Sequence, residues 1–254
     1  MIALLGNLSR DLFPGREPTA GGAPFHAARA LRLIDTRAEL YVRCAADDRD
    51  ALVTAVARLG TPVHYVPGAS TATFRIDYEG ERRLMEVESI GDTWLPEDVP
   101  KLDGGVRWVH VAPLLRSDFP AETLARVARD HLVSLDGQGL VRVPDLGELR
   151  LDGAYDRAML EHVRVLKLAE EEAEVLGDPA ALGVPEVIVT HGPRGATLYT
   201  GGGAEEVPAF RLEAEPTGAG DAFAVAYVAA RAGGFAPAAA ARRATAVVGD
   251  LLAA

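Results

Sequence analysis

A glycine-rich turn followed by an acid is the segment of this chain best suited to carry chemistry. It reads TGAGD over 217–221 and leads into an uninterrupted apolar helix pattern. Glycines let a backbone turn tightly and approach a ligand closely, and the first N–H groups of a helix can bind an anion. Asp221 is poorly placed to hold an anion but well placed to take a proton from a group that attacks one. The segment therefore points to phosphoryl transfer, although alone it also fits a turn followed by an acid that stabilises the helix dipole.

Composition narrows the class of protein. The 254 residues are 48% hydrophobic and 25% charged, an ordinary globular composition. A net charge of −11 argues against a general nucleic-acid binder. The single Cys44 excludes an internal disulfide framework, and the longest apolar run, 222–230, is too short to span a membrane. We expect a cytoplasmic protein that binds neither nucleic acid nor membranes.

The elements that must position the acid alternate between strand and helix patterns. Short apolar runs read as buried strands, and longer segments with helical periodicity follow most of them. This alternation predicts a doubly wound, mainly parallel α/β sheet flanked by helices, with ligands outside the carboxyl ends of the strands. No linker divides the chain, so we expect a single domain over 1–254.

The region 62–92 has a different character. It contains two period-2 runs separated by a turn at Gly80, which predicts a hairpin with one wet face and a small antiparallel lid. Arg75, Arg82 and Arg83 favour an edge kept soluble by charge. The alternative is that one of these arginines reaches a phosphorylated acceptor. The strands of a lid could also pair with another chain, which would allow a homodimer.

Three segments together resemble the ribokinase/PfkB family of carbohydrate and nucleoside kinases over nearly the whole length. The family's C-terminal signature matches EPTGAGDAF (215–223), its Gly-Gly motif matches GGAPFHAA (21–28), and its nucleotide-side strand and turn match VIVTHGPRGA (187–196). DGQGLVR (136–142) and LKLAEEEA (166–173) most resemble the branch with inositol kinases. The resemblance implies a ribokinase-like fold and an ATP- and Mg²⁺-dependent transfer of the γ-phosphoryl group to a carbohydrate or polyol, with an inositol-like acceptor favoured.

The resemblance also assigns roles around the glycine turn. Asp221 would be the general base for the acceptor hydroxyl. The amides of Gly218, Ala219 and Gly220 would form the anion hole for the charge on the transferred phosphoryl group, and Thr217 would contact the nucleotide. This division suits a reaction that depends mostly on positioning and electrostatic stabilisation.

The acceptor side rests on Asp11, Gly21, Gly22 and His26. The first three align with sugar-contacting positions of the family, and a carboxylate can accept hydrogen bonds from two neighbouring hydroxyls. The alternative for Asp11 is a loop cap. His26 stands where many members have a substrate-contacting Asn, so it is either a ligand or a packed residue. Arg142 falls near the expected cleft without an assigned role.

On the donor side, the resemblance has Thr190, Gly192 and Gly195 lining the nucleotide. Many members carry Asn-x-x-Glu for magnesium and phosphate handling, but here Ala169 replaces the Asn and only Glu172 remains. Magnesium at Glu172 would be held mostly through water and nucleotide phosphates, as this ion prefers.

Two alternatives to a polyol kinase stay open. One is a nucleoside or sugar-phosphate kinase of the same family. The other is a kinase-like protein that binds a ligand without turnover, which Ala169 and the short chain favour and which Asp221 and its glycines oppose. The sequence leaves the acceptor hydroxyl and the donor unnamed.

Overall fold

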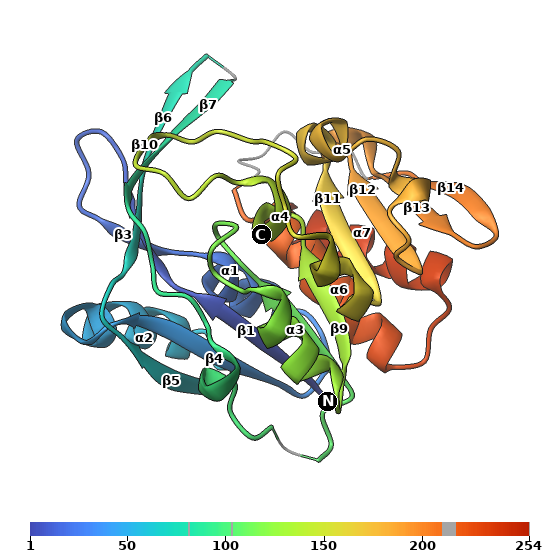
Figure 1. The fold of residues 1–254 in the computed structure, drawn as a ribbon, viewed down its shortest axis with the longest axis horizontal. Coiled ribbons are helices and arrows are strands. Elements are labelled where there is room, and N and C mark those ends of the chain that lie inside the picture. The colour runs from blue at the N-terminus through green and yellow to red at the C-terminus, as the bar shows by residue number, and fades with distance from the viewer. Residues whose placement is uncertain (81, 103, 210–216, 254) are drawn as a thin grey trace.

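A nine-stranded sheet forms the centre of the molecule in the computed structural model, which describes residues 1–80, 82–102, 104–209 and 217–253 (Figure 1). In spatial order its strands are β14 (Gly203–Val207), β13 (Ala196–Thr200), β12 (Glu186–Thr190), β11 (Val165–Ala169), β9 (Leu132–Asp136), β8 (Trp108–Ala112), β1 (Ile2–Asn7), β4 (Ala38–Ala45) and β5 (Val63–Gly68). The strands from β12 to β5 pair in parallel, and β13 and β14 add an antiparallel edge.

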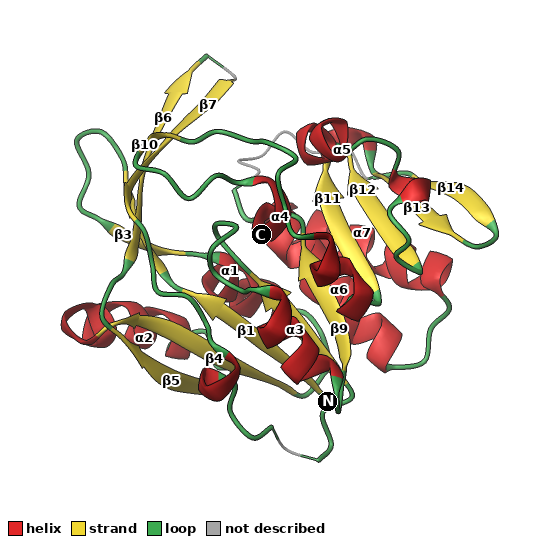
Figure 2. Cartoon of the chain, in the orientation of Figure 1, coloured by secondary structure: helices red, strands yellow, loops and turns green. Residues whose placement is uncertain are grey.

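Helices cover both faces of this sheet, as a doubly wound fold requires (Figure 2). One face carries α1 (Ala23–Leu31), α2 (Arg49–Ala57), α6 (Ala219–Ala232) and α7 (Pro237–Ala253). The other carries α3 (Ala121–Ala128), α4 (Gln138–Val141) and α5 (Glu170–Leu176). Short 3₁₀ helices are η1 (Ala46–Asp48), η2 (Pro96–Asp98), η3 (Arg157–His162), η4 (Pro179–Ala181) and η5 (Gly192–Arg194). The predicted fold class is confirmed.

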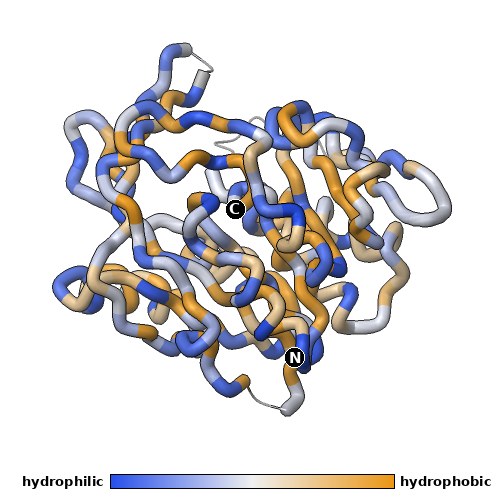
Figure 3. The backbone as a smooth tube through the Cα atoms, in the orientation of Figure 1, coloured by the Kyte–Doolittle hydropathy of each residue, from blue (hydrophilic) through white to orange (hydrophobic). Residues whose placement is uncertain are grey.

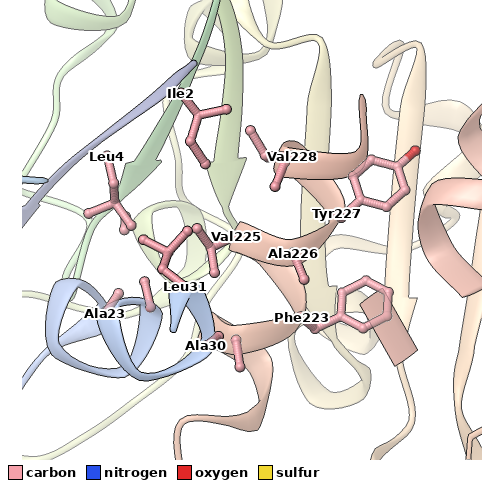
Figure 4. Close-up of a cluster of buried hydrophobic side chains, with 14 of the residues drawn as sticks. Ile2, Leu4, Ala23, Ala30, Leu31, Phe223, Val225, Ala226, Tyr227 and Val228 are labelled. Carbon is pink, nitrogen blue, oxygen red and sulfur yellow. The ribbon is translucent and has the colours of Figure 1, made fainter. Parts of the chain in front are cut away.

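Helix α6 is buried on every side along most of its length. All residues from Ala222 to Ala230 are buried, and a helix that is apolar all round belongs in a protein interior. In the same cluster, Leu31 of α1 lies beside Val225, and Ile2 of β1 lies near Val228 (Figure 4). This packing fixes the start of α6, and with it Asp221, against the rigid centre of the sheet.

The second sheet has five strands and its own small core, and we call it the lid. Its strands are β10 (Gly147–Glu148), β7 (Arg82–Ser89), β6 (Ala72–Glu79), β2 (Ser9–Leu12) and β3 (Thr19–Gly21). Phe74 and Ile76 of β6 face inward while Arg75 and Asp77 face solvent, which is the predicted period-2 pattern. The outer end of the β6–β7 hairpin is hydrophilic (Figure 3).

The segment 62–92 therefore supplies the hairpin of the lid, but its first strand belongs elsewhere. This first strand is β5. It pairs in parallel with β4, and its Val63 and Tyr65 pack against the core of the large sheet. The other three lid strands come from parts of the chain outside 62–92. Among the described residues, no helix is long and apolar enough to cross a membrane.

Candidate active site

A pocket lies where the lid meets the carboxyl end of the large sheet and the start of α6. It encloses about 440 Å³, part of it open to solvent. The structure brings six of the predicted site residues to its wall, namely Asp11, Gly22, His26, Thr217, Gly218 and Asp221. The lid adds Arg83 and Met85, and the segment after β9 adds Gln138 and Arg142. Residues far apart in the sequence thus meet at the sheet edge where such folds bind ligands.

Asp221 occupies the first turn of α6. Gly218, just before the helix, has a φ of 81°, and a Cβ built on it would lie 2.3 Å from Nδ1 of His26. Only glycine fits both the backbone conformation and this close approach. Within the described residues, the buried Oδ1 of Asp221 has no hydrogen-bond partner. An unpartnered carboxylate oxygen in a pocket wall is free to accept a proton or a hydroxyl.

The surroundings of Asp221 raise its pKa to about 6. Burial is the main cause, and the nearby carboxylate of Asp136 adds to it. The positive charges of Lys167, Arg142 and Arg83 oppose the shift. Asp221 is therefore a stronger base than an ordinary aspartate and is still mostly ionised at neutral pH.

A buried lysine lies directly beneath the glycine turn. Nζ of Lys167 is 3.3 Å from Oδ2 of Asp136, and a Cβ on Gly220 would lie 3.0 Å from the same Nζ. Burial disfavours the charge of Lys167, but nearby carboxylates, Asp136 first, outweigh burial and raise its pKa. In the sequence, the apolar run 163–168 predicts a strand around Lys167 and assigns the lysine no role. The signal that could have identified it is a lysine inside an apolar run.

The acceptor residues of the prediction cluster at the base of the lid. Asp11 is buried in β2 and accepts a hydrogen bond from Oγ of Ser9 at 2.7 Å. Burial raises the pKa of Asp11. Gly21 supports Asp11 from behind, since a Cβ there would lie 2.2 Å from its Oδ2. Burial lowers the pKa of His26 to about 4, so its ring is neutral, and its Nδ1 has no partner within the described residues.

The predicted donor residues lie outside this pocket. Thr190 ends β12, and its Oγ1 donates to the carbonyl of Leu168 at 3.1 Å. Gly192 begins η5 and Gly195 directly follows it, with φ values of 57° and 101°. Thr217 differs from the other predicted donor residues, because it lines the pocket. Its Oγ1 lies 3.3 Å from the hydroxyl of Tyr78 on the lid. Residues 215 and 216 of the signature fall outside the described residues.

Glu172 is buried, and its carboxylate accepts a hydrogen bond from the N–H of Ala169 at 2.8 Å. It also lies near Lys167, so a fixed positive charge is already present. The described residues hold no cluster of three or more His, Cys, Asp or Glu side chains that could bind a metal ion. A metal site made by protein ligands alone does not fit this arrangement.

Comparisons with known proteins place the chain among kinases. A family model described as pfkB family carbohydrate kinase matches residues 19–248. An inositol 3-kinase from Oryza sativa subsp. japonica is 36% identical over 159 residues, which is 58% of this chain and 38% of that protein, so the chain spans well under half of this relative.

Two solved structures show the same fold. A pyrophosphate-dependent kinase in the ribokinase family, complexed with a pyrophosphate analog and myo-inositol, has a TM-score of 0.86 at 22% identity and covers 100% of this chain and 95% of its own. A fructokinase from Vibrio cholerae O395, bound to fructose, ADP and calcium ion, has a TM-score of 0.73 at 20% identity, covering 98% and 90%. Because the family model matches most of the length of this chain, the protein belongs to the pfkB family of carbohydrate kinases.

Proposed function

We propose that this protein transfers a phosphoryl group to a hydroxyl of a small polyol, with an inositol as the favoured acceptor. The observation that carries the proposal is the position of Asp221. Its carboxylate has an unpartnered oxygen, lines a pocket opposite Asp11, and stands at the start of a helix whose first N–H groups have no partner within the helix. The inositol 3-kinase relative supports the choice of acceptor.

The acceptor side of the reaction uses Asp11, His26 and Asp221. The Asp11 carboxylate accepts hydrogen bonds from two neighbouring hydroxyls of the polyol, and the neutral His26 ring offers Nδ1 to a third. Asp221 accepts the proton of the hydroxyl that attacks. Because that hydroxyl becomes acidic as its oxygen bonds to phosphorus, a base with a pKa of about 6 is sufficient.

The phosphoryl side uses the glycine turn. The acceptor oxygen forms a bond to phosphorus, the bond from phosphorus to the leaving phosphate oxygen breaks, and the hydroxyl proton goes to Asp221. The amides of Gly218, Ala219 and Gly220 offset the charge that builds up on the phosphoryl oxygens. Lys167 adds a fixed positive charge beneath the turn without leaving its ion pair with Asp136.

The donor is ATP in the prediction from sequence, and pyrophosphate is a second candidate. The higher fold similarity to the pyrophosphate-dependent kinase than to the ADP-bound fructokinase, 0.86 against 0.73 in TM-score, favours testing it. Mg²⁺ would enter with either donor, bound to its phosphates and to water, because hard cations prefer such oxygen ligands.

The test is a matrix of donors and acceptors. Purified protein with Mg²⁺ receives ATP or pyrophosphate together with inositols, hexoses, sugar phosphates or nucleosides, and product is followed by ³¹P NMR. We expect the highest kcat/KM with an inositol, and loss of turnover in Asp221→Asn. Preference for a nucleoside or sugar phosphate would contradict the acceptor assignment. Absence of turnover with every pair would support a protein that only binds its ligand.

A further inference from the structure

Two arginines from different elements line the pocket. Arg83 comes from β7 of the lid, and Arg142 directly follows α4 beyond the carboxyl end of β9. Both line the pocket that contains Asp11 and Asp221. Neither has a role in the mechanism above.

The same two arginines also line a second cavity. This cavity encloses about 1010 Å³, much of it open to solvent, and its lining includes Glu171 and Glu172 at the start of α5 and Glu86 and Glu148 of the lid. Arg83, Met85 and Arg142 are the residues that the two cavities share. The guanidinium groups therefore stand at the boundary between the acceptor pocket and the cleft beside α5.

The charges of these arginines are not neutralised by direct ion pairs. Arg75 of the lid pairs with Glu88 at 2.7 Å, and Arg116 near the pocket pairs with Asp152. In the described part of the chain, neither Arg83 nor Arg142 has an ion-pair partner. Desolvation and the like charge of Arg142 lower the pKa of Arg83. Two like charges held close together at a cavity favour binding of an anion.

The sequence alone favoured a soluble-edge role for the lid arginines, and the structure separates them. Arg75 fits that role, because it points to solvent and pairs with carboxylates across the hairpin. Arg83 is exposed as well, but it also lines the pocket, so solubility alone does not account for its position. The lid also touches the glycine turn through Tyr78 and Thr217. Arg83 is thus brought to the site by the same element that covers it.

We propose that Arg83 and Arg142 hold the phosphoryl group between them during its transfer, which rests on the kinase function proposed above. Each guanidinium donates to non-bridging oxygens of the group while the acceptor oxygen bonds to phosphorus and the leaving phosphate departs with the electron pair of the broken bond. The proton still goes to Asp221. The charges that repel each other in the empty site are neutralised by the phosphoryl oxygens.

The first test separates kcat from KM. Arg83→Met and Arg142→Met should each lower kcat by about 10²-fold or more, the usual effect of losing one charge-stabilising group. The KM for inositol should change much less, because the acceptor is held by Asp11 and His26. Arg75→Met is the matched lid control and should retain wild-type kinetics. Unchanged kcat with a raised inositol KM would make the two arginines acceptor ligands and overturn the proposal.

The second test does not depend on turnover. Inorganic pyrophosphate is titrated into each protein by calorimetry in the absence of acceptor. Wild type and Arg75→Met should bind it alike, and both site variants should bind it at least about tenfold more weakly, as expected when a charged partner is lost. Equal binding by all four proteins would overturn the proposal.

A wild type that binds pyrophosphate through these arginines but phosphorylates no acceptor would refute the proposed function while leaving the anion site standing. If the methionine variants do not fold, Arg83→Lys and Arg142→Lys replace them. These variants keep the positive charge but lose the bidentate contact of the guanidinium group. Their affinity for pyrophosphate should therefore lie between that of the wild type and a tenfold loss. Wild-type kcat and binding in both lysine variants would count against the paired guanidinium contact.

Discussion

At the scale of single residues, the site depends on which groups are left without partners. Oδ1 of Asp221 and Nδ1 of His26 are buried and unpartnered within the described residues. Leaving a buried polar atom unpaired costs about 1–3 kcal/mol, so such atoms in residues that line a pocket suggest a ligand that pairs with them. By contrast, the buried carboxylate of Glu172 is engaged with the backbone and Lys167. Hydrogen bonding thus distinguishes the two acids, because Glu172 accepts a backbone N–H and Oδ1 of Asp221 has no partner among the described residues.

The raised pKa of Asp221 predicts the pH dependence of activity. Asp221 accepts a proton only when ionised, and its pKa is about 6. Activity should therefore be level above pH 7 and fall toward tenfold per pH unit well below pH 6. A plot of log kcat/KM for inositol against pH measures this.

Asp11 needs a control in that experiment, because its pKa is also raised. Asp11→Asn should raise the acceptor KM but keep the bend in log kcat/KM near pH 6. Asp221→Asn should fold normally and lose about 10³-fold or more in kcat, within the usual range for a general base. If Asp11→Asn removes the bend instead, Asp11 is the titrating group and the assignment to Asp221 is wrong.

At the scale of elements, turns and hairpins can be predicted from the sequence, but pairings between strands far apart in the chain cannot. The turn at 217–221 and the β6–β7 hairpin depend on neighbouring residues, and both were predicted. The lid pairs β2 with β6 across more than sixty positions in the sequence, and a pattern within one strand does not reveal its partner. For the same reason, the range 62–92 predicted for the lid also includes β5, which pairs with β4 in the large sheet.

The functional meaning of Arg83, Arg142 and Lys167 was hidden by the same limit. Each lies in a segment whose local pattern is satisfied by an ordinary strand or strand end. Their charges acquire significance only when β7, the residue after α4 and the middle of β11 meet around Asp221. Asp221 was identifiable because its turn and its acid are adjacent in sequence.

The junction between the glycine turn and α1 offers a test of that assembly. Gly218→Ala would force a Cβ into His26 at a positive φ, so both elements must shift. We expect a loss of about 1–3 kcal/mol in stability and a lower kcat, because α6 and Asp221 move together. Adding His26→Ala removes the two closest contacts, with Nδ1 and Cγ of the ring, but leaves a 2.8 Å contact with Cβ and the backbone strain, so stability should recover only in part. Chemical denaturation of the single and double variants measures this, and full additivity would contradict a direct contact.

At the scale of the whole molecule, the lid and the large sheet are joined by a buried loop between β8 and α3. Asp118 in this loop accepts the N–H of Leu114 at 2.8 Å, and its own carbonyl accepts the N–H of Trp94 at 2.7 Å. Leu114 and Leu115 belong to the lid core, whereas Trp94 stacks on Phe119 in the core of the large sheet. Asp118 therefore stands where the two cores meet, and its charge state bears on how they hold together.

Burial raises the pKa of Asp118 from 3.8 to about 7. The folded protein thus binds a proton there that the unfolded chain releases between these pH values. The stabilisation is complete below about pH 4 and is lost as pH rises through 7, with an upper limit of about 4 kcal/mol. Asp118→Asn, which cannot ionise, should lose much less stability between pH 5 and pH 8 than wild type. Urea denaturation midpoints at the two pH values measure this, with the exposed carboxylate variant Asp130→Asn as control. Equal losses in wild type and Asp118→Asn would show that Asp118 does not titrate in this range, and that the junction of lid and sheet is insensitive to pH.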